Sequence, residues 1–545
     1  MSGGAPPWKI VAGKPVGAVE GKPDRRAMEA LAAWLLPRLG DIFACAIFLG
    51  VLGLGSRLLN MDGDLGRHLT VGEFMLSSGQ IPTMDYFSHS RAGQPLVPHE
   101  WLAQVSFALV YRLMGLDGVV LLSAALISLT FALVYRQCLG TSGLPLAGLG
   151  LAGLAAAASS LHWLARPHLF TILFLVVWTG WMERLRKGVD QRWWAPAFLM
   201  LAWANLHGAF VAGFAVWAVY LLSAGLESAW RVRGLWASLG AVVRSREVLT
   251  WLRLGLAAFA ASLLNPVGLG VWKMSSGFLG SRYLVSHTAE YLPPDFQSPS
   301  AWSFLALIGA SILLTALGRA RLSLPAGLIL VSWTMFGAYS VRNVPLYAVL
   351  AAPILAGAAG EALRSEARFA GWLRFEHGLV QLQSRLRGGA WPAAVFLLAL
   401  AALAGGVRLD FVQQGNRFDP AVFPEAALDW VESQAAPGNV FNYFPWGGYL
   451  LYHSWPEQRA FIDGQTDFYG EAFTRQYEQV ITLSPGWQEI LRAYGVGWVL
   501  VPEEAFLAQA LRQEAGWRQV YQDQTAVIFF RQTEPAFQGI QGGGW

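Results

Sequence analysis

Two carboxylates stand two residues apart directly after the first long apolar stretch of the chain. Asp62 and Asp64 follow an apolar run at 41–59. Such a pair can bind a divalent cation such as Mg²⁺ or Mn²⁺ through its oxygens, or it can supply a general base. Asp is also a preferred N-cap, so either residue could instead begin a helix near Leu65, and the two roles are compatible.

Other polar residues at the ends of apolar runs could bind an anion. Arg166 and Arg342 are the main candidates, because guanidinium pairs with phosphate in a bidentate fork. Arg166 could instead be a boundary residue whose charged end reaches interfacial water. His207, which precedes a glycine, could simply form a tight helical hairpin. The remaining candidates for the same pocket are His68, His99, Glu100, His168, Asn205, His207 and Asn343.

The amino-acid composition indicates what kind of protein carries these candidate residues. The chain has 545 residues, of which 54% are hydrophobic and only 14% are charged. A soluble domain is about one-quarter charged. These values exclude a soluble enzyme, a disordered chain and a secreted disulfide scaffold. They indicate a polytopic helical membrane protein that contacts membrane lipids, and no nucleic-acid partner is expected.

Eleven apolar segments approach the roughly 20 residues that a membrane-spanning helix needs. They are 41–59, 117–136, 144–161, 169–184, 192–206, 208–226, 254–271, 301–318, 323–340, 344–360 and 391–408. The segment 99–115 is amphipathic and is interrupted by Gln104 and Arg112. We expect it to lie in the membrane interface without crossing.

The distribution of basic residues predicts the orientation. With the N-terminus inside and 99–115 not crossing, the cytoplasmic segments hold 23 Lys and Arg residues and the opposite loops of the membrane domain hold 6. This is the bias of the positive-inside rule. The prediction is a bacterial cytoplasmic-membrane protein whose cytoplasmic tail is 1–40, with its transmembrane domain at 41–408 and the polar candidates on the extracytoplasmic side.

The segment 409–545 differs in character and is predicted to be a small extracytoplasmic α/β domain. Short apolar runs at 440–444, 459–463, 498–502 and 526–531 predict strands, and the patterns at 423–434, 471–482 and 503–515 predict helices. The loop that follows 459–463 concentrates Asp463, Asp467, Tyr469 and Glu471. We favour an ordinary Asp-Gly turn there, although a loop at a strand end is a common place for a site.

With the residues in this order, the chain resembles the GT-C superfamily of integral-membrane glycosyltransferases, which use sugars linked to polyprenyl phosphates. Asp62 and Asp64 resemble the acidic motif that follows the family's first span. His99-Glu100-Trp101 through Gly115 resembles its interfacial helix, and 116–139 resembles its second span. The strings RPHLF, WANLHG, RNVPLYA and FNYFPWGGYLL are also similar to those of a group of bacterial membrane proteins.

The resemblance implies an all-α membrane domain of about eleven spans with interfacial helices in the first outer loop. It also implies that Asp62 or Asp64 is the base or a metal ligand, and that Arg342 holds the donor phosphate. The chain departs from the family's pattern in two motifs. The acidic motif reads DGD where an Asp-Glu pair is more usual, and the motif at His99-Glu100-Trp101 lacks a doubled proline.

The leading hypothesis is therefore a membrane glycosyltransferase that moves a sugar from a polyprenyl-phosphate-linked donor to a hydroxyl of a glycan, a lipid or a protein. One alternative is a transporter or flippase for a lipid-linked or anionic solute. That class favours polar groups at the bilayer midplane and related halves. A second alternative is a non-catalytic membrane assembly protein in which the C-terminal domain is a docking module.

Overall fold

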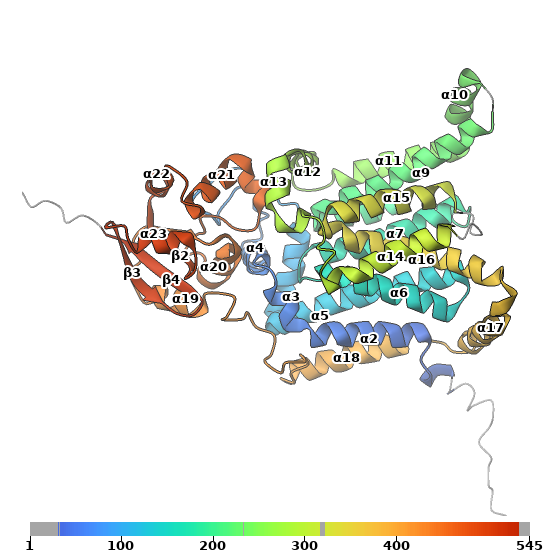
Figure 1. Cartoon of the computed structure of the whole chain (residues 1–545), viewed down its shortest axis with the longest axis horizontal. Helices are drawn as coiled ribbons and strands as arrows, with labels where there is room; N and C mark the ends of the chain where they lie inside the picture. Colours follow the sequence, from blue (N-terminus) through green and yellow to red (C-terminus); the bar gives the residue numbers. More distant parts are fainter. Residues whose placement is uncertain (1–30, 32, 233, 317–321, 533–545) are drawn as a thin grey trace, which may run out of the picture.

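The computed structural model describes residues 31, 33–232, 234–316 and 322–532, so most of the predicted tail lies outside it. Each of the eleven predicted apolar segments overlaps a helix (Figure 1). The helices are α2 (Leu39–Gly53), α5 (Trp101–Ser142), α6 (Pro145–Ser159), α7 (His168–Arg186), α8 (Pro196–Leu206), α9 (Val211–Trp230), α11 (Arg246–Ser262), α14 (Trp302–Ala316), α15 (Leu324–Tyr339), α16 (Val344–Arg364) and α18 (Ala390–Ala404).

One predicted boundary is displaced. The segment expected at 254–271 is the helix α11, which begins at Arg246 and ends at Ser262. Ser245 caps its start by accepting a hydrogen bond from the Val248 N–H, and an Asn265-Pro266 turn follows its end. The other α-helices between α9 and α18 are α10 (Leu235–Arg244), α12 (Gly270–Gly280), α13 (Arg282–His287) and α17 (Ala370–Ser384).

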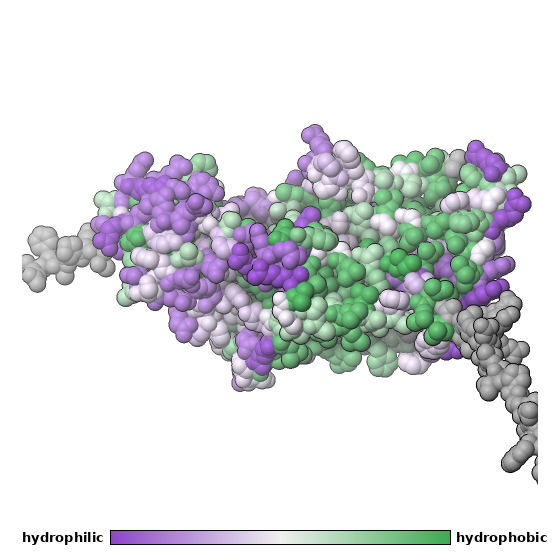
Figure 2. Space-filling model, turned by 90° about the horizontal axis from the view of Figure 1, so that it is seen from below, coloured by the Kyte–Doolittle hydropathy of each residue, from purple (hydrophilic) through white to green (hydrophobic). Residues whose placement is uncertain are grey.

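The helical part carries the apolar surface of a membrane protein. Among the described residues, six helices are both long and apolar enough to cross a membrane, and three shorter apolar helices accompany them. Figure 2 shows a broad hydrophobic surface over the middle of the molecule, with hydrophilic surface over the C-terminal part and at the opposite end. A lipid bilayer covers such a surface without exposing backbone polar groups, because helices satisfy these groups internally.

Small residues allow the central helices to approach closely. The helix α16 packs against α5, α6 and α15, and α6 packs against α5. Ala348, Ala351 and Ala352 of α16 are fully buried, as are Ala152 and Ala155 of α6. Close backbone approach through alanine is typical of helix packing in membranes, where van der Waals contact replaces the hydrophobic effect.

The first outer loop contains two helices besides the short α3 (Gly55–Asn60). The helix α4 (Asp64–Ser78) packs against the first part of α5. The helix α5 is broken at Gly115, whose φ of 60° lies in the left-handed region that favours glycine. The part before Gly115 is therefore a separate helix that begins at Trp101. The loop between α2 and the second part of α5 thus contains helices where the interfacial helices were expected.

The C-terminal part is an α/β unit, as predicted. Its sheet has the order β1-β2-β4-β3, with β1 parallel to β2 and the other neighbours antiparallel. The strands are β1 (Asn439–Asn442), β2 (Val496–Pro502), β3 (Trp517–Gln522) and β4 (Ala526–Arg531). The helices are α19 (Glu425–Glu432), α20 (Gly447–Ser454), α21 (Thr466–Ile481), α22 (Trp487–Ala493) and α23 (Phe506–Leu511).

Two strand predictions differ from the structure. The strand predicted over 459–463 is wrong, because Ala460 forms only an isolated bridge, to Ser88 of the first outer loop. The apolar run there is buried by packing instead of by sheet pairing. The strand β3 was not predicted, because its sequence WRQVYQ is mostly polar and its side chains are largely exposed at the sheet edge.

Glycines bring the C-terminal part into backbone contact with α4. A Cβ atom at Gly448 of α20 would clash with the carbonyl oxygen of Gly63, and one at Gly66 would clash with the carbonyl oxygen of Gly448. Beside this contact, Arg67 Nε lies 3.3 Å from Asp463 Oδ1 in a buried ion pair. The helix that begins at Asp64 is therefore fixed between the membrane domain and the C-terminal part.

The close approach at Gly448 predicts the effect of a single methyl group. The Gly448→Ala variant should lose about 1–3 kcal/mol of stability, since overpacked sites force the backbone apart. Thermal unfolding of the purified protein in detergent should give a lower apparent Tm. Gly516→Ala is the matched control, because a Cβ at Gly516 would meet no atom within 4 Å. Equal Tm values for the two variants would contradict this packing.

Candidate functional site

An arginine between two aspartates forms the centre of the candidate site. Arg166 lies in the turn between the 3₁₀-helix η1 (Ser160–His162) and α7. Its Nη1 is 2.9 Å from Asp62 Oδ2, and its Nη2 forms an ion pair with Asp64. The three side chains are 15–20% exposed, so the ionic group is not fully sealed from solvent. Asp62 Oδ1 also accepts a hydrogen bond of 2.9 Å from the Asp64 N–H at the start of α4, which supports the helix-start role as well.

Glu290 connects this centre to the second predicted arginine. Glu290 Oε2 lies 3.4 Å from Arg166 Nη1, and Glu290 Oε1 lies 3.0 Å from Arg342 Nη1. Arg342 Nη1 also donates a hydrogen bond of 2.9 Å to Tyr291 Oη. The structure thus brings Asp62, Asp64, Arg166 and Arg342 into one ionic network through a residue of a fourth loop.

The backbone fixes that fourth loop in place. Glu290 and Tyr291 belong to the 3₁₀-helix η3 (Ala289–Tyr291), and Arg342 belongs to η5 (Val341–Asn343). The Ser340 hydroxyl donates to the Glu290 carbonyl at 2.9 Å, and the Val341 N–H donates to the Leu292 carbonyl at 2.9 Å. These bonds hold the two short helices side by side and orient Glu290 toward both arginines.

A second group of predicted residues surrounds Glu100. His207 Nε2 lies 3.4 Å from Glu100 Oε1, and His99 Nε2 lies 3.7 Å from the same oxygen. His68 Nδ1 lies 3.8 Å from Glu100 Oε2. His207 joins this group to the first network, because its Nε2 is also 3.5 Å from Arg342 Nη2.

The other three predicted residues have structural contacts. His168 Nε2 lies 2.8 Å from the His162 carbonyl oxygen, which fixes the turn that carries Arg166. Asn205 accepts a hydrogen bond of 2.8 Å from Trp101 Nε1 and donates to the Leu264 carbonyl. The Asn343 side chain donates to the Phe336 carbonyl of the preceding helix, α15, at 3.1 Å. His168 and Asn205 therefore position the site, and Asn343 contacts none of the other site residues.

Several residues of the site were missed by the sequence reasoning. Glu290 and Tyr291 lie in the long segment between α11 and α14, and neither was among the predicted site residues. Asp467, for which an ordinary turn was favoured, has its Oδ2 3.8 Å from His99 Nδ1. Ionisable residues close to the ends of apolar runs were the signal that identified the predicted site residues. The same signal could have been sought along the longer segments that connect the helices.

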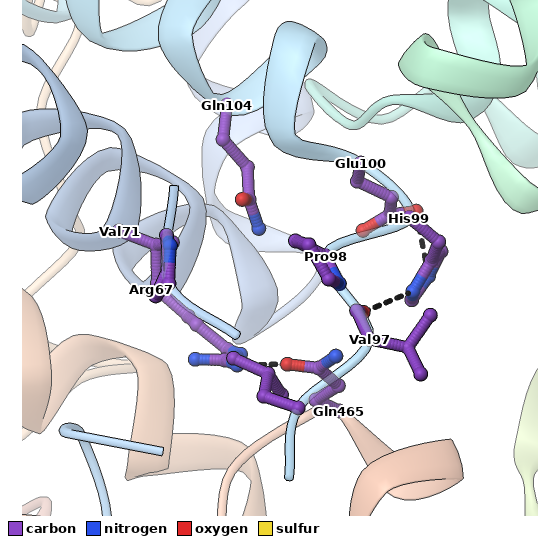
Figure 3. A pocket seen from close by; sticks show the side chains of 10 residues that line it. Arg67, Val71, Val97, Pro98, His99, Glu100, Gln104 and Gln465 are labelled. Carbon is purple, nitrogen blue, oxygen red and sulfur yellow. Dashed lines mark hydrogen bonds and ion pairs between the residues drawn. The ribbon is translucent and has the colours of Figure 1, made fainter. Parts of the chain in front are cut away.

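A small cavity of about 10 Å³ lies next to Glu100, between α4 and the C-terminal part. In Figure 3 the side chains of Arg67 and Gln465 meet across it, and His99 and Glu100 line the facing wall. Arg67 Nη1 and His68 Nε2 are buried and have no hydrogen-bond partner. A space of this size holds about one water molecule, which would accept a hydrogen bond from Arg67, the one of these two residues that lines the cavity.

Burial and crowding of charge shift the protonation of the carboxylates. Burial raises the pKa of Asp62 to about 7; Arg166 opposes the rise, and the nearby charges of Asp64 and Glu290 add to it. Burial also raises the pKa of Glu100, against the opposing charge of His99. The pKa of Glu290 falls to about 2 because the two arginines outweigh its burial. The carboxyl group of Asp62 can therefore exchange a proton near neutral pH.

The arrangement can supply a base and bind an anion. A carboxyl group with a pKa near 7 is suited to proton transfer at physiological pH. Arg342 Nη2 has only the 3.5 Å contact with His207 and retains donor capacity for a phosphate. In the described part of the chain, no group of three or more His, Cys, Asp or Glu side chains is arranged to hold a metal ion. The guanidinium of Arg166 occupies the position between the aspartates instead.

Comparison with known proteins gives structural matches alone. No protein-family model and no curated protein matches the chain. The oligosaccharyltransferase of Archaeoglobus fulgidus, with a tethered acceptor peptide, superimposes with a TM-score of 0.54 at 12% identity. This match covers 90% of this chain and 74% of that chain. The AglB structure from the same organism, in complex with an inhibitory peptide and a dolichol-phosphate, gives 0.54 at 12% identity, over 89% and 74%.

ArnT from Cupriavidus metallidurans covers 90% of this chain and 97% of its own at 16% identity, but its TM-score of 0.47 is too low to carry an argument. The archaeal matches extend over most of both chains. The resemblance drawn from the sequence is therefore confirmed at the level of the fold. The chain has the fold of the GT-C integral-membrane glycosyltransferases.

Proposed function

We propose that the protein is a membrane glycosyltransferase that moves a sugar from a polyprenyl-phosphate-linked donor to a hydroxyl of a glycan, a lipid or a protein. One observation carries the proposal. In a GT-C fold, Asp62 and Asp64 meet Arg166 beside Arg342 at the end of the bundle that faces the C-terminal part. The positive-inside bias supports placing this end outside a bacterial cytoplasmic membrane.

In this mechanism Asp62 accepts the proton of the acceptor hydroxyl. The acceptor oxygen then bonds to the anomeric carbon of the donor sugar while the bond from that carbon to the phosphate oxygen breaks. The electron pair of the broken bond remains on the phosphate, and Arg342 and Arg166 stabilise the resulting charge. Glu290 positions both arginines. His68, His99, Glu100 and His207 shape the surrounding wall.

The archaeal match supports the class of carrier. AglB was solved with a dolichol-phosphate, a polyprenyl phosphate, and with a peptide. The acceptor side here would be formed by the C-terminal part, because the Asp467 side chain reaches His99 and Gln465 contacts Arg67.

Removing the carboxylate charge should abolish transfer. The Asp62→Asn/Asp64→Asn double variant keeps the side-chain shape but cannot accept a proton, so we expect loss of at least about 100-fold in rate, the lower end of general-base contributions. The measurement is transfer of labelled sugar in membranes, with the apparent Tm of the purified variant as the check on folding.

Glu73→Gln is the matched control for that experiment. Glu73 is a carboxylate of the same helix, α4, and forms an exposed ion pair with Arg112 away from the site. Its removal should leave transfer unchanged. Full activity of a folded double variant would exclude the base mechanism and favour the transport or assembly alternatives.

The pKa of Asp62 predicts the pH dependence. The carboxylate form is the base, so below about pH 7 the rate should fall with decreasing pH, and above that value it should level off. In Glu290→Gln, a charge that raises the pKa of Asp62 is removed, and the midpoint should move to lower pH. The measurement is the pH profile of kcat/KM. A midpoint unchanged in this variant would argue against Asp62 as the titrating group.

The divalent cation predicted at Asp62 and Asp64 is a separate proposal, and the mechanism above uses no metal. A cation there would have to displace the guanidinium of Arg166. Because Arg166 already supplies positive charge, we expect EDTA treatment to change the transfer rate by no more than about twofold, in contrast to the several kcal/mol that a catalytic metal contributes. A larger loss that Mg²⁺ or Mn²⁺ restores would establish the cation.

A further inference from the structure

A large cavity lies in the helical bundle far from the candidate site. It encloses about 820 Å³ and is lined by residues of α5, α7, α9, α15 and α16. The helix α7 begins at His168 beside the candidate site and ends at Arg186 on the cavity. At 1.5 Å per residue these ends lie roughly 27 Å apart. The cavity is therefore a separate feature, and its volume suits a small-molecule ligand.

One wall of the cavity is apolar and open. Leu133, Ile329 and Leu350 are among its aliphatic side chains. Gly140 contributes space, since a Cβ atom there would meet no atom within 4 Å. Apolar surface that encloses volume between spanning helices can accommodate a hydrocarbon chain.

The rim of the same cavity is polar and carries excess positive charge. Five basic and three acidic side chains line it, which gives a formal charge of +2. They are Arg136, Arg184, Arg186, Lys187, Arg192, Glu183, Asp190 and Glu361. These residues lie in or beside the segments that the positive-inside rule assigns to the cytoplasmic side.

The ion pairs of the rim leave cationic groups available. Asp190 lies 2.8 Å from Arg192 and 3.7 Å from Arg184. Glu183 is likewise shared by two cations, Arg186 at 3.0 Å and Lys187 at 3.5 Å. Each of these carboxylates thus faces two positive charges.

Two further groups at this cavity lack polar partners. Arg136 is exposed and forms no ion pair with any residue that the structure describes. Trp181 also lines the cavity, and its buried Nε1 has no hydrogen-bond partner. An indole N–H and an unpaired guanidinium are both donors suited to phosphate oxygens.

We propose that this cavity binds the phosphate headgroup of an anionic membrane lipid, whose hydrocarbon chain lies along the apolar wall. Anionic headgroups concentrate at the cytoplasmic surface, where basic residues attract them. A free phosphate would share the polar contacts but would leave the apolar wall unused. The inference does not depend on the glycosyltransferase proposal, because its test measures binding and not transfer.

The test is native mass spectrometry of the full-length protein, delipidated in a non-ionic detergent. Dioleoylphosphatidylglycerol is the probe, and dioleoylphosphatidylcholine and inorganic phosphate are the comparisons. We expect one tightly bound phosphatidylglycerol per chain and much weaker binding of the zwitterionic lipid. Equal binding of the two lipids, or binding of inorganic phosphate without lipid, would overturn the proposal.

Charge reversal locates the site. Arg136→Glu should weaken phosphatidylglycerol binding by about tenfold or more, since it replaces a charge-assisted contact with repulsion. Arg253→Glu is the control: Arg253 is also an exposed helical arginine, but it lies outside the cavity. Equal effects of the two variants would mean general surface attraction and would contradict the site.

A cavity-filling variant tests the cavity independently of charge. Gly140→Phe should fill the space one helical turn from Arg136 and reduce binding to a similar degree. Gly150→Phe is its control, because a Cβ at Gly150 also meets no atom within 4 Å but the residue does not line the cavity. Unchanged binding in a folded Gly140→Phe protein would show that the lipid binds elsewhere.

Discussion

The arrangement of the outer loops depends on one guanidinium that three carboxylates share. Arg166 contacts Asp62, Asp64 and Glu290, which come from two loops far from it in the sequence. Removing one member of this partly buried ionic group leaves uncompensated charge, which is destabilising. The first outer loop, the turn before α7 and the loop before α14 must therefore converge on one point. The bundle supplies that convergence through the close packing of α5, α6, α7 and α16.

The charged groups of the membrane domain gather at its two ends. At one end, carboxylates exceed arginines, and this crowding moves the pKa of Asp62 toward neutrality. At the other end, cations exceed carboxylates around an apolar-walled cavity. The helix α7 contributes residues at both ends, and α16 begins two residues after Arg342 and lines the cavity with Glu361. One end of the bundle thus carries an excess of negative charge and the other end an excess of positive charge. The two ends can therefore bind different ligands, although the same helices connect them.

Hydropathy alone predicted the helices, because apolar length is what a bilayer selects. The scarcity of charged residues at the ends of the apolar runs likewise pointed to Asp62, Asp64, Arg166 and Arg342. Glu290 could not be assigned in this way. Its role depends on the path of the long loop before α14, which brings it next to Arg166 and Arg342. The strand predicted at 459–463 failed for a related reason: burial against the first outer loop produces the same apolar run as burial in a sheet.

The glycine contacts between α4 and α20 have a consequence for how such proteins can be recombined. Carbonyl oxygens of one segment occupy the space where side chains of the other would begin. The carboxylate of Asp64 likewise occupies the space where a Cβ atom of residue 464 would lie, and the glycine at this position leaves room for it. The loop 60–78 and the C-terminal part therefore pack as one unit. A chimera with another protein of this fold would have to exchange the segments 60–78 and 444–467 together, although 365 residues lie between them in the chain.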